Sequence, residues 1–126
     1  MTALTILFLL TVKHALCDLY LQSFLKLNKS SYTGGWPHYL QHALGTLVVF
    51  VWFVDPVIAV MLASIDGVVH WHIDWFKHRV LIHYQHRTGM KMETQARDWY
   101  WCVQAVDQIL HFATYYILAV IWMGHS

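Results

Sequence analysis

Four apolar segments fill most of this 126-residue chain, and only short polar stretches separate them. Only 12% of the residues are charged, which is about half the share found in a typical water-soluble domain. A helix that crosses a bilayer needs about 20 residues, so four such helices and their connections account for nearly the whole sequence. We therefore expect an all-α integral membrane protein, with a single domain over residues 1–126 built as a bundle of four transmembrane helices.

Turn and loop residues mark the ends of the four expected helices. The polar stretch 28–35 separates the first two helices, and Pro37 suits the first turn of the second. Asp55 and Pro56 form a tight turn before the third helix, which ends near Gly89. The expected helices cover Thr2 to about Lys26, Pro37 to Val54, Val57 to Thr88, and Glu93 to about Trp122.

Basic residues gather at the first and third connections, whereas the second connection has none. They are Lys26 and Lys29 at the first connection, and Lys77, Arg79, Arg87, Lys91 and Arg97 around the third. Basic loops stay on the cytoplasmic side of a membrane. We therefore expect a bacterial inner-membrane protein with both termini on the non-cytoplasmic side and with membrane lipids as partners. Tryptophans near the same connections fit an interfacial belt, at Trp36, Trp71, Trp75 and Trp99.

Every expected helix carries His and Asp at four-residue steps within its apolar segment. These residues are His14 and Asp18, His38 and His42, Asp66, His70 and Asp74, and Asp107 and His111. Positions i and i+4 share one helical face, and ionisable groups inside spanning helices usually mark function. Counting at about 1.5 Å per residue places one residue of each helix at a similar depth, roughly 9 to 12 Å below the cytoplasmic surface. His72 points to a different face and is not expected in the site.

Imidazole and carboxylate ligands together suit Zn, Mn or Fe, so these faces predict a site for one or two divalent transition-metal ions. The expected ligands are Asp18, His42, Asp66, His70, Asp107 and His111. His14 is expected as a ligand or a general base, and Asp74 and His38 as ligands or as groups that orient ligands and relay protons. Two other interpretations remain open, namely a proton or ion pathway and His–Asp hydrogen bonds that lock the bundle.

The same residues resemble the bacterial and phage membrane family catalogued as domain of unknown function 3307. The resemblance is carried by His14-x3-Asp18 with Gln22, Asn28-Lys29, His42, Asp66 with His70 and Asp74, and Asp107-Gln108-x2-His111. It spans nearly the whole chain and implies the fold and the polar constellation, but no reaction, because that family has no established activity. The His and Asp placement is more distantly similar to small inner-membrane proteins described as predicted metal-dependent hydrolases.

We interpret the pattern as a membrane-embedded metal-dependent hydrolase that acts on an amphiphilic substrate, either a lipid or a phosphate-bearing molecule. One alternative is a non-enzymatic phage or bacterial factor that acts through a host membrane protein, as a homo-oligomer, or by ion or proton movement. A further alternative is a non-haem iron redox enzyme. Nucleic acid is not an expected partner, because the formal net charge is only +1.

Overall fold

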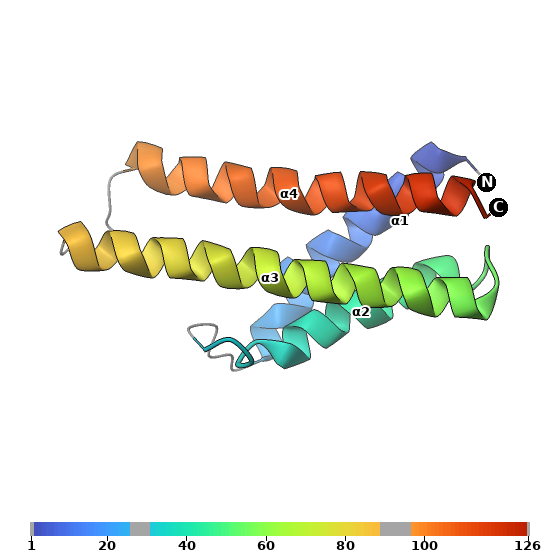
Figure 1. Cartoon of the computed structure of the whole chain (residues 1–126), viewed down its shortest axis with the longest axis horizontal. Helices are drawn as coiled ribbons and strands as arrows, with labels where there is room; N and C mark the ends of the chain where they lie inside the picture. The colour runs from blue at the N-terminus through green and yellow to red at the C-terminus, as the bar shows by residue number, and fades with distance from the viewer. Residues whose placement is uncertain (1, 26–30, 89–96, 126) are drawn as a thin grey trace.

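The computed structural model describes residues 2–25, 31–88 and 97–125, and within these ranges it is an antiparallel bundle of four helical segments without strands (Figure 1). The first segment is α1 (Ala3–Ala15), which continues as a π-helical turn η1 (Leu16–Tyr20) and a 3-10 turn η2 (Leu21–Phe24). The other helices are α2 (Trp36–Phe50), α3 (Pro56–Thr88) and α4 (Arg97–Met123). The predicted all-α fold is therefore confirmed.

The described helix ends agree with the predictions except in the first segment and at the end of α2. The first segment leaves α-helical geometry after Ala15 and ends at Phe24, where Leu25 is extended. Pro37 lies in the first turn of α2, and α3 runs unbroken to Thr88. Helix α2 ends at Phe50 rather than Val54, and a hydrogen bond from the Phe53 N–H to the Phe50 carbonyl oxygen closes a turn after it. The helix ends before Pro56 because proline disfavours helical geometry in the residue that precedes it. The ends predicted at Lys26, Gly89 and Glu93 lie outside the described residues, as do Lys29 and Lys91.

Three helical stretches are long and apolar enough to cross a membrane, namely Ala3–Phe24, Pro56–Tyr84 and Tyr100–Met123. Helix α2 has 15 residues and is about 22 Å long, which is less than the roughly 30 Å of a bilayer core. The bundle of four helices is thus confirmed, while membrane crossing stays a prediction for every helix, and α2 is the shortest of them for a span.

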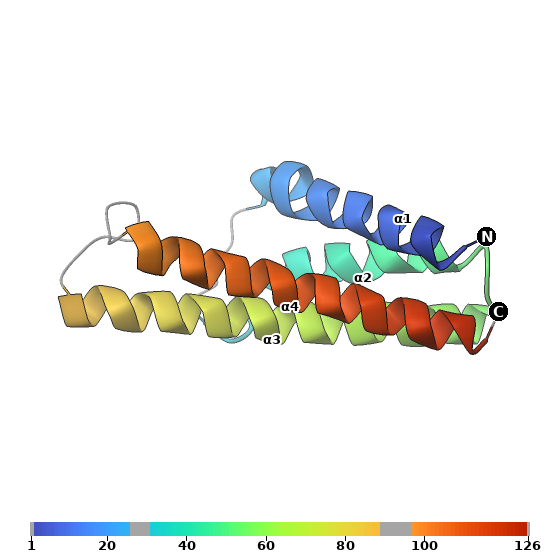
Figure 2. The same ribbon diagram turned by 90° about the horizontal axis from the view of Figure 1, so that it is seen from above.

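The helices form a ring in which each contacts two neighbours: α1 packs on α2 and α4, and α3 packs on the same two helices. The start of α1, the end of α4 and the turn between α2 and α3 lie at one end of the bundle, and the end of α3 and the start of α4 lie at the opposite end (Figures 1 and 2). This arrangement agrees with the prediction that both termini face one side of a membrane. Which side is cytoplasmic stays a prediction.

An apolar core fills the end of the bundle that carries the termini. Every helix contributes to it, through residues that include Ile6, Leu10, Phe50, Leu62, Leu118 and Trp122. The predicted polar positions begin one turn beyond this core, toward the middle of the bundle. The core therefore closes the interior on the side of the termini.

Helices α2 and α3 approach each other closely at Gly67. A Cβ atom placed there would lie 3.0 Å from the Cβ of Ala43 and 3.5 Å from the carbonyl oxygen of Tyr39. Small residues allow such close contact between helices in a membrane. This contact brings the His and Asp face of α3 against the histidine face of α2.

Replacing Gly67 by Leu should therefore weaken the bundle. We expect the Gly67→Leu variant to lose about 1–3 kcal/mol of unfolding free energy, because the larger side chain forces α2 and α3 apart. Gly124→Leu is the control, since a Cβ there meets only the Ile121 carbonyl oxygen at 3.4 Å. Unfolding in mixed detergent, followed by circular dichroism, measures the difference. Equal stability of the two variants would contradict the close packing.

Candidate metal centre

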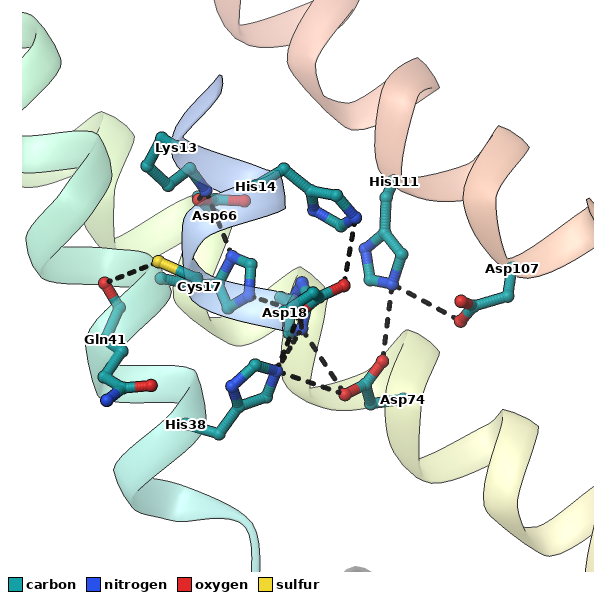
Figure 3. A network of polar contacts seen from close by, with 12 residues as sticks. Lys13, His14, Cys17, Asp18, His38, Gln41, Asp66, Asp74, Asp107 and His111 are labelled. Atoms are coloured by element: carbon teal, nitrogen blue, oxygen red, sulfur yellow. Dashed lines mark hydrogen bonds and ion pairs between the residues drawn. The ribbon is translucent and has the colours of Figure 1, made fainter. Parts of the chain in front are cut away.

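Ten ionisable side chains from all four helices meet in the middle of the bundle (Figure 3). Nine of them are the predicted His and Asp residues, and the tenth is Lys13. Eight of the predicted residues are buried, and the Asp18 side chain keeps 20% of its surface exposed. The four-residue spacing therefore did identify one polar interior shared by all the helices.

The first part of the cluster is a carboxylate surrounded by three imidazole rings from α2 and α3. Oδ1 of Asp18 lies 2.8 Å from Nε2 of His42, 3.0 Å from Nε2 of His38 and 3.7 Å from Nε2 of His70. The rings of His42 and His70 stack with their centroids 3.5 Å apart. One ligand atom from each of these four residues falls within 4.8 Å of the others, so the four can surround a single ion.

The second part of the cluster joins α3 and α4 beside His14. Nε2 of His111 lies 3.3 Å from Oδ1 of Asp107 and 3.4 Å from Oδ1 of Asp74. One ligand atom from each of these three residues also lies within 4.8 Å of the others, and the same holds for His14, His70 and His111. Either set could therefore surround one ion. Imidazole and carboxylate donors are thus available on both sides of the cluster.

Two carboxylates connect the two parts. Asp18 directs Oδ1 to His38 and His42, and Oδ2 to His14 at 3.0 Å. Asp74 directs Oδ2 to His70 at 3.4 Å and Oδ1 to His111. Each carboxylate therefore offers one oxygen to each part of the cluster.

Several donor atoms in this interior have no hydrogen-bond partner among the described residues. They include Nε2 of His14, Nε2 of His111 and Oδ1 of Asp107, all buried. A carboxylate or imidazole atom lies 3.0 to 3.4 Å from each of them, but outside hydrogen-bond geometry. A buried polar atom without a hydrogen bond is destabilising, so these positions are compatible with an ion held between the imidazoles and the carboxylates.

Lys13 is a member of the cluster that the sequence reasoning missed. Its Nζ lies 2.7 Å from Oδ2 of Asp66, 3.1 Å from the hydroxyl of Tyr115 and 3.2 Å from Nδ1 of His42. An ammonium group has three protons and no acceptor, so these three contacts use all of them. The signal available in the sequence was a single charged residue in the apolar stretch 3–17, directly before His14.

The lysine reaches this position because Gly45 on α2 has no side chain. A Cβ at Gly45 would lie 2.6 Å from Cγ and 2.8 Å from Cδ of Lys13. The aliphatic part of the lysine therefore crosses α2 at this glycine before its ammonium group enters the interior. Neither residue alone indicates the contact in the sequence.

This contact determines the roles of Asp66 and His42. Asp66 accepts hydrogen bonds from Lys13 and from the hydroxyl of Thr46, and it lies outside all three groups of candidate ligands. Because the ammonium group only donates, Nδ1 of His42 is the acceptor. The ring proton of His42 is then on Nε2, which donates to Asp18.

Two further polar side chains contact the carboxylates of the cluster. Lys77 lies 3.2 Å from Asp107 and 4.0 Å from Asp74, and the Gln108 amide donates to Asp107. His72 bonds to the Tyr32 hydroxyl, away from the cluster, so its exclusion is confirmed.

A polar cavity leads from this cluster to the surface between α1, α3 and α4. Its volume is about 410 Å³, and its walls include His14, Asp18, Gln22, Asp74, Lys77 and Gln108. The cavity lies toward the end of the bundle with the interhelical connections, opposite the apolar core. Asp18 and Asp74 therefore both line a space that a small polar group could enter.

No family model, curated protein or solved structure matches this chain. The resemblance to the domain of unknown function 3307 and to metal-dependent hydrolases therefore stays a prediction. The argument for function rests on the geometry of the cluster.

Removing the ammonium group of Lys13 should strongly destabilise the bundle. We expect Lys13→Met to lose about 3–5 kcal/mol, because it leaves the Asp66 carboxylate buried without its counter-charge. The double variant Lys13→Met with Asp66→Leu should recover most of that loss, since neither charge then remains. Unfolding of metal-free protein in mixed detergent measures both values. A double variant no more stable than the single one would show that the pair is not the stabilising interaction.

Proposed function

We propose that all four helices span a membrane and that their interior holds a centre for two divalent transition-metal ions. The outward face of α2 supports the first part of this proposal. Leu40, Leu44 and Val48 follow one another at four-residue steps and are all exposed, which suits a helix that faces lipid. Large apolar side chains are exposed on every helix while His, Asp and Lys side chains are buried in the middle of the bundle, which is the reverse of a water-soluble protein.

Charge balance supports a bound cation. Together with the adjoining Lys77, the cluster has four carboxylates and two ammonium groups, so with ionised carboxylates and neutral imidazoles it carries two excess negative charges. Uncompensated charge is strongly disfavoured in an apolar interior. One divalent cation would offset these charges, and metal-bound hydroxide and an anionic substrate would offset those of a second ion. Imidazole with carboxylate favours Zn, Mn or Fe.

We assign Asp18, His38 and His70 to one ion, and Asp74, Asp107 and His111 to the other. Asp18 and Asp74 would bridge the ions. The observation that carries the proposal is that each of these carboxylates directs its two oxygens to different histidines. His14 adjoins both parts, with its ring 5.5 Å from that of His42 and 5.0 Å from that of His111. It completes the ligand set of the second ion or accepts a proton there.

His42 and Asp66 receive roles other than the ligand roles that the sequence predicted. His42 donates through Nε2 to Asp18 and so fixes the orientation of that carboxylate. Asp66 holds the ammonium group of Lys13 against Nδ1 of His42. Groups that orient metal ligands in this way usually affect metal affinity.

The reaction we propose is hydrolysis of a phosphate ester on an amphiphilic molecule. Bound divalent ions generate hydroxide near neutral pH and polarise phosphoryl oxygens. Lys77, Gln22 and Gln108 on the cavity walls would bind the remaining phosphoryl oxygens. Water adds to phosphorus, the bond to the alcohol oxygen breaks, and the leaving alcohol takes one proton.

Passage of ions through the bundle is a weaker alternative, because a conduit needs a polar path between both surfaces. The apolar core around Leu10, Leu62 and Leu118 closes the interior on one side. Steady ion flux into liposomes, abolished by Asp66→Asn, would overturn the hydrolase proposal.

The metal content of the purified protein tests the centre. We expect about two equivalents of Zn, Mn or Fe by elemental analysis, and loss of most of this metal in the double variant His70→Ala with Asp107→Ala. His83→Ala is the control, because His83 is exposed on the projecting end of α3. Metal-free protein after purification with supplied metals and without chelators would contradict the centre. A characteristic iron signal from anaerobic protein would instead favour redox chemistry.

The role of Lys77 tests the reaction. We expect phosphate release from phosphatidic acid in mixed micelles, and a decrease of about 100-fold or more in the Lys77→Met variant, because one cationic contact to the transition state is lost. Arg79→Met is the matched control, since Arg79 lies over the Trp75 ring outside the cavity. Equal rates for the two variants would rule out phosphate binding by Lys77, provided that both retain metal.

A further inference from the structure

A second cavity adjoins the site on the outer side of α3 and α4. It is a groove of about 530 Å³, a size typical of pockets for small molecules. Its walls are almost entirely apolar, and the two charged residues in them are Lys77 and Asp107. Asp107 belongs to the polar cluster and Lys77 contacts it, so the apolar groove and the charged site share part of their walls.

Helical spacing explains how the groove is built. Val69, Ile73 and Val80 lie along one side of α3, and Val103, Val106 and Leu110 lie along the facing side of α4. Steps of three, four and seven residues keep these side chains on one face of each helix. The two apolar rows therefore form an elongated space beside the polar cavity.

Lys77 lines both spaces. Among the described residues, its ammonium group donates one hydrogen bond, to Asp107, and lies 4.0 Å from Asp74. It can therefore donate to a further acceptor at the junction. An anionic group placed there would have a cation beside it and an apolar groove leading away.

We infer that this groove holds one hydrocarbon chain of the substrate, namely the chain nearest its phosphate group. The phosphate group itself contacts Lys77. The inference rests on the proposed function, because it names the substrate as a long-chain phosphate ester. The occupant is a lipid chain because the groove offers apolar contact along its length and has a positive charge in its wall, at Lys77.

A comparable groove between α1 and α2 lacks a cation that could bind a phosphate group. It has a volume of about 460 Å³ and is lined by apolar residues together with Lys13 and Gln41. The ammonium group of Lys13 already donates to Asp66, His42 and Tyr115. This second groove therefore has no cation available for a phosphate, and it provides a matched control within the same protein.

Two equivalent substitutions test the assignment. Val106 lines the groove between α3 and α4, Val48 lines the groove between α1 and α2, and both are at least half exposed. We expect Val106→Trp to raise KM for a sixteen-carbon phosphatidic acid by about tenfold or more, since losing contact with about two methylene groups suffices for such a factor. Hydrolysis of a short-chain soluble phosphate ester and the metal content should not change. Val48→Trp should alter none of these values.

A measurement without turnover separates this inference from the hydrolase proposal. Cys102 is a free, exposed thiol on the wall of the groove. In nanodiscs of phosphatidylcholine, hexadecyl phosphate should slow alkylation of Cys102, detected by mass spectrometry, whereas inorganic phosphate should not. Protection of Cys102 without any release of phosphate would support the groove as the chain site and contradict the proposed hydrolysis. Hydrolysis without protection, or equal effects of the two tryptophan variants, would overturn the groove as the chain site.

Discussion

The ion pair between Lys13 and Asp66 organises the interior on which the rest of the structure depends. An isolated charge is strongly disfavoured in an apolar bundle, and here each charge compensates the other at 2.7 Å. The same ammonium group donates to His42 and Tyr115, and the Tyr115 hydroxyl contacts Nδ1 of His14. One cation thereby orients imidazole rings on two different helices toward Asp18.

The polarity of the bundle changes along its axis. Apolar side chains close the end with the termini, the charged cluster occupies the middle, and a polar cavity opens toward the other end. Such an interior can admit a substrate from one side and prevent passage to the other. The geometry is better suited to binding and chemistry than to transport.

A polar cavity and an apolar groove that share Lys77 would fit the two halves of an amphiphile. The phosphate ester would lie among cationic and metal-binding groups, and its hydrocarbon chain would remain in an environment like the bilayer. Both halves would keep the surroundings they prefer, because the groove faces the outside of the bundle. Selectivity for long-chain substrates would then follow from the packing of α3 against α4.

The sequence by itself determined which face of each helix carries the chemistry, because a four-residue step places His14 with Asp18, and Asp107 with His111, on one side of a helix. It also determined the helix number and the exclusion of His72. It could not distinguish Asp66, which binds Lys13, from Asp74, which lies between two sets of histidines. That distinction depends on how each helix is rotated against its neighbours. Periodicity fixes positions within one helix, whereas only the packed tertiary structure brings Lys13 across Gly45 to a residue 53 positions away.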